Sequence, residues 1–270
     1  MENKKKQLDR LLAAYTKEDV CLAFSGGIDS SLLLKLMVKK AEVSHKKVYA
    51  VTFDTTLHPR CDTEIAEKVA EEIGASHHIL KINELDNPQI LQNPVNRCYL
   101  CKRELFRKLL DFAREMDAPV ILEGTNADDL QVYRPGLAAI QELGIKSPLV
   151  EAGFTKKEVR EYAKEVGISV AERPSTPCLA TRLPYGTDIT LSVLQQIEEG
   201  EAWLRSRGYK NVRIRVHGEI ARLELDAEAF SSCLKERDEI VRKLKEIGFT
   251  YITLDLEGFR SGSMDIRIKQ

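Results

Sequence analysis

Short apolar runs alternate with amphipathic stretches through the first two thirds of the chain. Five runs have the length and residue types of buried strands: residues 20–24, 48–53, 77–82, 119–124 and 146–150. Between them apolar residues recur at helical spacing, as in the stretch 99–116. Strands that alternate with helices predict a parallel sheet covered on both faces, so the fold class expected is α/β.

The last part of the chain has a different order of elements. It predicts a helix at 190–206, strands at 211–216 and 220–225, a helix at 227–247 and a strand at 251–256. We therefore expect one domain over residues 1–188 and a smaller α+β subdomain over residues 189–270. Residues 168–190 contain three prolines and no periodicity, which is more typical of a functional loop than of a connection.

Composition and charge narrow the classes of partner. The chain has 270 residues and a formal net charge of −1, which gives no general electrostatic case for nucleic-acid binding. No apolar run approaches the roughly 18 residues that cross a bilayer, and the N-terminus M-E-N-K-K-K lacks the apolar region of a secretory signal. We therefore expect a cytoplasmic protein without a membrane partner, in which disulfides rarely persist.

A glycine-rich polar loop, S-G-G-I-D-S-S, joins the first apolar run to the first helical stretch. Its glycines let backbone N–H groups curve around an anion, and the helix that follows adds its dipole. A plain turn with a Ser or Asp helix cap is the alternative, but the position after the first strand of an α/β pattern favours a phosphate site. The residues assigned to it are Ser25, Gly26, Gly27, Asp29 and Ser30, and Asp29 is placed to hold Mg²⁺.

This loop lacks the Gly-Lys-Ser/Thr ending of a Walker A loop. It resembles the S-G-G-x-D-S signature of the PP-loop ATP pyrophosphatase superfamily, whose members cleave ATP between the α and β phosphates and form an adenylate. The resemblance implies that Phe53 and Asp54, at the end of the second run, border the adenosine. The E-G-T-N-A-D-D loop lies at the same edge of the predicted sheet, so Gly124 and Asp128 are also assigned to the nucleotide.

Of the six cysteines, Cys21 and Cys233 lie in apolar settings typical of buried thiols, and Cys61 is solitary and stays undecided. The other three are Cys98 and Cys101, in R-C-Y-L-C-K, and Cys178, in P-C-L-A-T-R-L-P-Y-G. At i and i+3 near the start of a helix, the first two thiols share a face, and nearby basic residues favour their thiolates. Arg173 and Arg182 flank Cys178 and act in the same direction.

The C-x-x-C pair is compatible with several chemistries. A disulfide is disfavoured by the expected compartment, a zinc site lacks a second C-x-x-C or a spaced His pair, and a thioredoxin-like pair follows a strand in a different fold. Three cysteines with one open position suit a 4Fe–4S cluster bound through three of its irons.

Several motifs together, among them S-G-G-I-D-S-S, R-C-Y-L-C-K, Y-R-P-G and P-C-L-A-T-R-L-P-Y-G-T, resemble the LarE family of ATP-dependent sulfur transferases almost end to end. The resemblance implies ATP, Mg²⁺ and a small-molecule substrate, pyridinium-3,5-biscarboxylic acid mononucleotide. Its carboxylates are adenylated, with release of AMP and pyrophosphate, and become thiocarboxylates for the nickel-pincer cofactor of lactate racemase. It also implies a homo-oligomer.

Some family members give up the sulfur of the cysteine that corresponds to Cys178. Others have two more cysteines and bind a 4Fe–4S cluster whose free iron carries an extra sulfide. Because it has Cys98 and Cys101, this chain resembles the second kind. We hypothesise that Cys98, Cys101 and Cys178 hold the cluster, and that an external sulfide donor recharges it.

The C-terminal strand V-R-I-R-V places Arg213 and Arg215 on one face, and Arg260 lies in E-G-F-R. Without the resemblance, a solvated strand face paired with acidic residues is the preferred interpretation. The resemblance favours a site for the substrate phosphate, since guanidinium groups bind phosphate with two donors. It also implies that Glu201 and Glu224 lie near the catalytic Cys178, in roles that the sequence does not define.

Three other functions compete with this interpretation. A cluster-dependent tRNA thiolase can also combine a PP-loop with three cysteines, but the near-neutral charge and Ile28 disfavour it. A synthetase of the NAD or GMP synthetase type would leave the three cysteines unexplained. A nucleotide-sensing protein with a structural zinc would be separated from the others by metal analysis.

Overall fold

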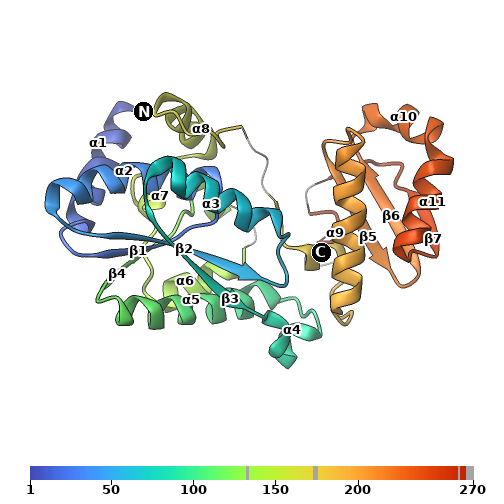
Figure 1. Ribbon diagram of the computed structural model, residues 1–270, viewed down its shortest axis with the longest axis horizontal. Coiled ribbons are helices and arrows are strands. Elements are labelled where there is room, and N and C mark those ends of the chain that lie inside the picture. Colours follow the sequence, from blue (N-terminus) through green and yellow to red (C-terminus); the bar gives the residue numbers. More distant parts are fainter. Residues whose placement is uncertain (132–133, 173–175, 261, 266–270) are drawn as a thin grey trace. The chain divides into compact units, whose positions relative to one another are not determined.

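The computed structural model describes residues 1–270 apart from 132–133, 173–175, 261 and 266–270 (Figure 1). The chain forms two compact units. The first consists of Met1–Glu84 and Asn96–Thr176, and the second of Leu85–Val95 and Pro177–Gln270. The division into domains at residues 188 and 189 stays a prediction, because compactness alone does not show which segments fold on their own.

The described part of the first unit contains a sheet of four strands in the order β3-β2-β1-β4, and all neighbouring strands are parallel. The strands are β1 (Val20–Ala23), β2 (Val48–Thr55), β3 (Ser76–Ile82) and β4 (Val120–Leu122). The α/β class predicted from the alternation of strands and helices is therefore confirmed.

Helices cover both faces of this sheet (Figure 1). A first hydrophobic cluster contains Leu22 and Ala50 of the sheet and residues of α1 (Glu2–Tyr15), α2 (Ile28–Ser44), α3 (Cys61–Ile73), α7 (Pro148–Glu151) and α8 (Lys156–Glu165). A second contains Cys21 and Val51 with residues of α5 (Arg97–Glu115) and α6 (Gly136–Glu142). Because adjacent residues of β1 and β2 enter opposite clusters, both faces of the strands are buried, as a parallel sheet requires.

The fifth strand predicted at residues 146–150 is wrong. Only Lys146 forms a parallel bridge, to Leu122, and the helix α7 begins two residues later at Pro148. Proline has no N–H to donate to a sheet, whereas its fixed φ suits the first position of a helix. The short apolar run therefore continues as a helical turn.

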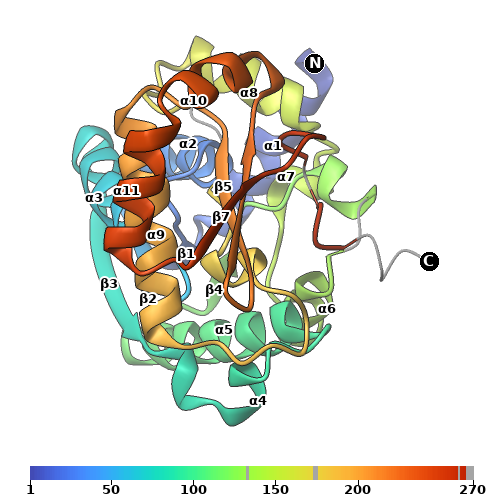
Figure 2. The same cartoon turned by 90° about the vertical axis from the view of Figure 1, so that its right-hand side faces the viewer.

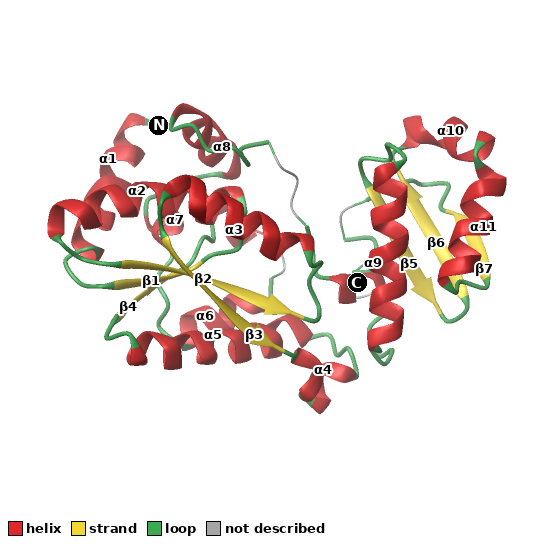
Figure 3. Cartoon of the chain, viewed as in Figure 1, coloured by secondary structure: helices red, strands yellow, loops and turns green. Residues whose placement is uncertain are grey.

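The second unit contains a three-stranded sheet in its described residues, ordered β5-β6-β7 (Figure 3). Figure 2 shows its strands β5 and β7 from another side. Strand β5 (Val212–His217) is antiparallel to β6 (Ile220–Leu225), which is parallel to β7 (Tyr251–Leu254). The helices are α4 (Pro88–Leu91), α9 (Leu191–Ser206), α10 (Phe230–Lys235) and α11 (Arg237–Ile247). The single helix predicted at 227–247 is thus interrupted at Glu236. Turns of 3-10 helix cover Glu84–Asp86, Ala127–Gln131, Leu179–Arg182 and Ala227–Ala229.

Gly200 allows α9 to approach the sheet of the second unit closely. A Cβ at this position would lie 2.5 Å from Ile214 Cδ1 of β5 and 3.2 Å from Leu244 Cδ2 of α11. The helix therefore packs against both elements through a residue without a side chain. None of the described helices is long and apolar enough to cross a membrane.

Candidate active site

The phosphate loop of residues 25–31 lies between the end of β1 and the first turn of α2. Gly26 has φ +64°, and a Cβ there would lie 2.7 Å from the Cα of Ala66 in α3. Backbone of α3 therefore packs directly on the loop, and only glycine fits. Gly27 is the cap residue of α2 and has no side chain, so the first amides of α2 point out of the helix without a side-chain cap.

Two serines fix the shape of this loop. Ser30 Oγ accepts a hydrogen bond from the backbone N–H of Ser25 (3.3 Å) and donates to the carbonyl of Gly27 (3.1 Å). Ser25 Oγ accepts from the N–H of Gly27 (3.3 Å). The loop is thus held by its own side chains in a conformation that presents backbone donors, which is the arrangement an anion binds.

Replacing Gly26 by Ala should reduce the free energy of unfolding by about 2–4 kcal/mol, since it adds a left-handed Cβ and a backbone clash. Gly74, which caps α3 at φ +75°, has no atom within 4 Å of a built Cβ, so Gly74→Ala is a matched control. Gly74→Ala should lower the free energy of unfolding only by the cost of a left-handed alanine, about 1–2 kcal/mol. Urea unfolding of both variants measures the difference, and equal losses would contradict close packing of α3 on the loop.

The loop that follows β4 lies against the first turn of α2. A Cβ on Gly124 would lie 3.0 Å from the backbone N of Ser30 and 3.3 Å from Asp29 Cβ. Asn126 Nδ2 donates to Asp29 Oδ1 (3.1 Å), and Asp128 Oδ2 accepts from the backbone N–H of Lys156 (2.9 Å). The structure therefore brings together Asp29, Gly124 and Asp128, three of the residues that the sequence assigned to the nucleotide.

Lys156 is a member of this site that sequence reasoning missed. Its Nζ forms an ion pair with Asp29 Oδ2, and with Asn126 it occupies both carboxylate oxygens. The sequence T-K-K-E was interpreted as a capping box, which the structure confirms at Thr155 and Glu158. A capping box gives the start of a helix but not the direction of its lysines, so no local signal connected Lys156 with Asp29.

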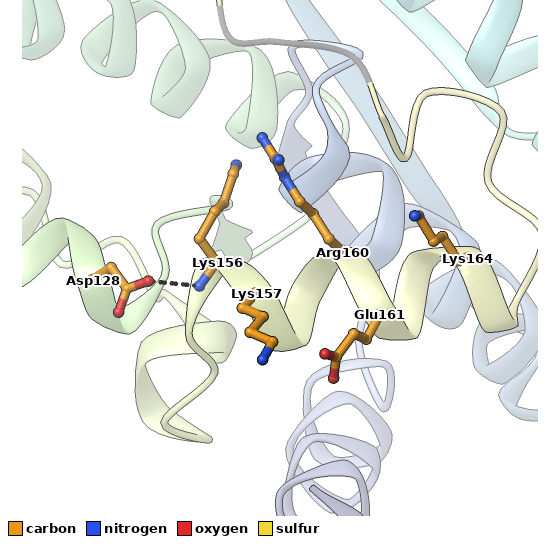
Figure 4. Close-up of a pocket in the computed structure, with 6 residues that line it drawn as sticks. All are labelled: Asp128, Lys156, Lys157, Arg160, Glu161 and Lys164. Carbon is orange, nitrogen blue, oxygen red and sulfur yellow. Dashed lines mark hydrogen bonds between the residues drawn. The ribbon is translucent and has the colours of Figure 1, made fainter. Parts of the chain in front are cut away.

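A cavity of about 570 Å³ adjoins Lys156 along α8. Six residues line it: Asp128, Lys156, Lys157, Arg160, Glu161 and Lys164. Figure 4 shows the side chains of Lys156 and Arg160 on one side of α8 and that of Lys157 on the other. Four of the six lining side chains are cationic, so the charge along α8 is positive, and Lys156 and Arg160 lie on the same side of the helix.

The end of β2 lies beside α5. Phe53 packs edge to face on Phe106, with ring centroids 5.8 Å apart. The buried Glu84 accepts hydrogen bonds from the backbone N–H groups of Thr56 (2.9 Å) and Leu57 (3.4 Å), which fixes the loop after β2. The contact of Phe53 and Asp54 with adenosine stays a prediction.

Cys98 and Cys101 lie in the first turns of α5, as predicted. Cys98 Sγ accepts from Arg97 Nη2 (3.7 Å), and the buried Cys101 thiol donates to Glu84 Oε1 (3.8 Å). The next residue, Lys102, extends over the ring of Phe106 and reaches within 4.0 Å of Glu123 Oε2. Burial lowers the pKa of Lys102, against the opposing effect of the Glu123 carboxylate.

Cys178 belongs to the second unit and directly precedes the 3-10 turn Leu179–Arg182. The fully buried Arg182 donates to the carbonyls of Pro177 (2.8 Å) and Cys178 (3.0 Å). Its Nε and Nη2 also donate to Oε1 and Oε2 of Glu201, at 2.8 Å each, in a bidentate salt bridge. This guanidinium therefore fixes the backbone that carries Cys178. Arg173, assigned as the other flanking cation, lies outside the described residues.

Glu201 is buried on α9 beneath this loop. Burial alone would raise the pKa of its carboxyl, but the hydrogen bonds and charge of Arg182, with the N–H of Ile214, lower it. Glu224 Oε2 accepts hydrogen bonds from Nε (3.0 Å) and Nη2 (2.8 Å) of Arg215. Arg215 Nη1 also donates to the carbonyl of Thr181 (3.0 Å). Glu201 and Glu224 thus each bind an arginine that also donates to backbone carbonyls of the Cys178 loop. A part for these two carboxylates in catalysis stays a prediction.

The three arginines assigned to a phosphate differ in their surroundings. The buried Arg215 forms an ion pair with Glu224, and Arg260 forms ion pairs with Asp255 (3.2 Å) and Glu257 (2.6 Å). Arg213 instead lies over the ring of Phe259, 5.3 Å from its centroid. Burial, followed by the nearby charge of Arg182, lowers the pKa of Arg213 to about 10, against the opposing effect of the Glu201 carboxylate. Because Arg215 and Arg205 add to the positive charge here, Arg213 is the best placed of the three for an anion.

No group of three or more His, Cys, Asp or Glu side chains is close enough to hold a metal within the part of the chain that the structure describes. Cys98 and Cys101 belong to the first unit and Cys178 to the second. Thiols are the ligands that an iron–sulfur cluster takes, and an arginine donor lies beside Cys98 and another beside the Cys178 backbone. That these three cysteines hold one cluster stays a prediction.

Comparison with known proteins supports the PP-loop interpretation of the first unit. Residues 7–136 match the asparagine synthase family model. The tRNA-specific 2-thiouridylase of Halothermothrix orenii is 26% identical over 194 residues, which cover 58% of this chain and 54% of that protein.

Two relatives match nearly the whole chain. An uncharacterized protein of Synechocystis sp. is 38% identical over 262 residues, which cover 96% of this chain and 93% of that one. The pyridinium-3,5-bisthiocarboxylic acid mononucleotide synthase of Lactiplantibacillus plantarum is 37% identical over 246 residues, 91% of this chain and 88% of that enzyme. The chain therefore belongs to the LarE family, that of the pyridinium-3,5-bisthiocarboxylic acid mononucleotide synthase, within the ATP-utilising PP-loop proteins.

Proposed function

We propose that this protein is an ATP-dependent sulfur transferase that converts the carboxylates of pyridinium-3,5-biscarboxylic acid mononucleotide to thiocarboxylates. The observation that carries the proposal is a phosphate loop shaped by Gly26, Ser25 and Ser30 in a chain 37% identical to an enzyme named for the bisthiocarboxylic product. The product would serve the biosynthesis of the nickel-pincer cofactor.

The reaction has two stages at each carboxylate. In the first, a substrate carboxylate oxygen attacks the α-phosphorus of ATP, the bond to the bridging oxygen breaks, and pyrophosphate leaves. The amides at the start of α2 and the hydroxyls of Ser25 and Ser30 bind the phosphate oxygens during this step. Mg²⁺, held by Asp29, would neutralise charge on the phosphates. In the second stage a sulfide sulfur attacks the acyl carbon, and AMP leaves with the carboxylate oxygen.

The second unit supplies a site for the remainder of the substrate in this proposal. Arg213 binds the phosphate of the substrate mononucleotide, together with Arg215 on the same strand and Arg260, which follows the Phe259 ring under Arg213. Arg182 and Glu201 hold the backbone of Cys178 in place. A 4Fe–4S cluster held by Cys98, Cys101 and Cys178 would supply sulfide for the transfer, recharged by an external donor.

Lys156 has a defined part in this scheme. Its ammonium neutralises Asp29, and if Asp29 held Mg²⁺ instead, the same ammonium would be free to bind the β- and γ-phosphate oxygens. Lys156→Met should therefore weaken the binding of Mg-ATP and of pyrophosphate by about 10–100-fold, the value of one charged hydrogen bond. Binding of AMP, which lacks those phosphates, should change little in the same calorimetric titrations.

Lys157→Met is the matched control, because Lys157 follows Lys156 in sequence but extends to the other side of α8 (Figure 4). We expect it to change the binding of all three nucleotides by less than about threefold. A loss of pyrophosphate binding as large in Lys157→Met as in Lys156→Met would show that α8 acts only through its general positive charge.

The overall proposal is tested by anaerobic incubation of reconstituted protein with Mg-ATP and the biscarboxylic mononucleotide. We expect AMP, pyrophosphate and a mass gain in the substrate for each oxygen replaced by sulfur. The competing tRNA thiolase function is supported only by the 26% identity to a thiouridylase. Adenylate formation that requires tRNA, and not the mononucleotide, would favour that function instead.

A further inference from the structure

The sheet of the second unit has one apolar face and one charged face. Successive residues of a strand point to opposite faces, and the apolar face contains buried residues such as Ile214 and Leu223. Helices α9 and α11 approach that face at Gly200. On the other face, Arg215 of β5 lies opposite Arg222 of β6, and Glu224 follows Arg222 by two positions. Two guanidinium groups and a carboxylate therefore lie together on the charged face.

Arg222 joins two carboxylates there. Its Nη2 lies 3.3 Å from Glu224 Oε1, and its Nη1 forms an ion pair with Asp255 Oδ2. Glu224 also binds Arg215, and Asp255 Oδ2 also accepts from Arg260 Nη2 (3.2 Å). The result is a row of alternating charges, which we call the arginine row and which consists of Arg215, Glu224, Arg222, Asp255 and Arg260.

The two carboxylates of the arginine row are withdrawn from water. Glu224 is 0% exposed and Asp255 is 8% exposed. Each is bonded through both of its oxygens, because Glu224 Oε1 also accepts from Ser263 Oγ (2.6 Å) and Asp255 Oδ1 accepts from the N–H of Glu257 (2.9 Å). Neither carboxylate can turn without breaking buried hydrogen bonds, which is costly. Arg222 and these two groups therefore fix the directions of Arg215 and Arg260.

The charge of the arginine row suits a phosphate. Its three arginines and two carboxylates leave one positive charge, and Arg213, over the ring of Phe259, supplies a second. Glu257 also pairs with Arg260, but its side chain is 71% exposed, so water and salt screen it. A phosphate monoester carries about −1.5 to −2 charges at pH 7, which these two positive charges balance.

We propose that Arg222 is a positioning residue for the phosphate of the substrate. It acts through Glu224 and Asp255, which hold Arg215 and Arg260 in the directions that the phosphate oxygens require. This inference rests on the proposed function only in taking Arg213, Arg215 and Arg260 as a site for a phosphate monoester.

Binding of nicotinamide mononucleotide, a pyridinium nucleotide with a 5′-phosphate, tests the arginine row without requiring sulfur transfer. Nicotinamide riboside lacks the phosphate, so the ratio of the two affinities isolates the part that the phosphate contributes. Calorimetric titrations use the full chain saturated with Mg²⁺ and an ATP analogue that has a methylene group between the α and β phosphates. The phosphate loop is then occupied, and Arg213→Met should weaken binding of the mononucleotide at least tenfold, about the value of one charged hydrogen bond.

Asp255→Asn separates position from charge. It removes a negative charge, so the mononucleotide would bind more tightly if the row acted only through its net charge. Positioning predicts the opposite, because Arg222 and Arg260 lose the carboxylate that they share. We expect the mononucleotide to bind about tenfold more weakly and the riboside to bind as before. Arg222→Met should show the same loss, and Arg222→Lys should not restore binding, since a lysine lacks the planar fork of donors.

Arg207→Met is the matched control. Arg207 also joins two carboxylates of the second unit, Glu236 (3.2 Å) and Glu239 (2.9 Å), but it is not part of the arginine row. Its removal should change the affinity for either compound by less than about twofold. Circular dichroism verifies that each variant is folded. If Arg222→Met does not fold, Asp255→Asn, which keeps the shape of the side chain, still decides the question.

Unchanged or tighter binding of the mononucleotide in folded Asp255→Asn overturns the inference. Equal losses for mononucleotide and riboside, or a parent that binds both equally, overturn it as well. A parent whose binding of the mononucleotide depends on Arg213 and Asp255, but which forms no thiocarboxylate, supports the inference and refutes the proposed function. The two proposals therefore fail separately.

Discussion

Replacing Arg182 by Met should lower the free energy of unfolding by about 3–5 kcal/mol, the usual cost of removing one partner from a buried ion pair. The side chains of Arg182 and Glu201 are 0% and 1% exposed. Without the guanidinium, Glu201 would keep hydrogen bonds from Arg205 and from the N–H of Ile214. The carbonyl of Pro177 would lose its bond from Arg182, whereas that of Cys178 would keep its two bonds from Thr181. Urea unfolding followed by the fluorescence of Trp203, on the same helix as Glu201, measures the loss.

The size of this loss should depend on pH. The folded-state pKa of Glu201 is lowered below its ordinary value of 4.5, so the pair contributes its full stability above the unfolded pKa. That contribution is lost as pH falls through the folded pKa. In Arg182→Met, burial raises the pKa of Glu201, and the carboxyl becomes neutral at a higher pH. The difference between wild type and variant should therefore begin to shrink above pH 4.5, where the variant carboxyl takes up its proton, and shrink further below pH 4.5 as the wild type loses the stability of its ion pair.

Arg205→Met provides the control on the same carboxylate. Arg205 lies 3.3 Å from Glu201 Oε2, but its side chain is 34% exposed. Its removal should cost less than about 1 kcal/mol, as for other solvated pairs. Equal losses in the two variants would mean that Glu201 is stabilised by the general positive charge of this region and not by Arg182.

The first unit could be predicted largely from local signals. Runs such as Val48–Phe53 and the S-G-G-I-D-S-S loop are contiguous in sequence, and each is determined by its own residues and its immediate neighbours. The capping box at Thr155 is equally local and is present as expected. The error at residues 146–150 arose because a short apolar run does not distinguish a strand from a buried helical turn, and Pro148 decided the outcome.

The residues that the sequence missed make long-range contacts. Lys156 and Asp29 are separated by 127 positions, and Asn126 and Asp29 by 97. Propensity and periodicity act over a few residues, so they place Lys156 at the start of a helix but cannot show which carboxylate it meets. Such pairs follow from the order of the strands, which becomes known only with the fold.

The candidate residues of the second unit illustrate the same limit. The alternation of V-R-I-R-V predicts that Arg213 and Arg215 share a face. Of these two, however, only Arg215 is buried and hydrogen-bonded to the Glu224 carboxylate. Glu201 and Glu224 were assigned near Cys178 by family resemblance alone. The structure supplies the physical connection, because Arg182 and Arg215 bond both to these carboxylates and to the loop that begins at Cys178.

If the proposed function is correct, Cys178→Ala should reduce formation of the thiocarboxylate by about 10³-fold or more, because sulfur transfer is proposed to need Cys178 either as a cluster ligand or as the sulfur donor. Adenylation should continue, since its phosphate loop is made by residues of the first unit. Release of AMP and pyrophosphate, measured beside the mass of the substrate, separates the two stages. Cys233→Ala is the control, as this buried thiol lies on α10 of the second unit.

Cys101→Ala then distinguishes the source of the sulfur. If the cluster supplies it, this variant should lose both iron and repeated turnover after anaerobic reconstitution, and so should Cys178→Ala. If Cys178 gives up its own sulfur, Cys101→Ala should still complete one transfer, and Cys178 should lose the mass of hydrogen sulfide as it becomes dehydroalanine. Iron retained together with multiple turnovers in Cys101→Ala would refute the three-cysteine cluster. The reason is that Cys101, buried against Glu84 in the first turns of α5, would then have no part in holding it.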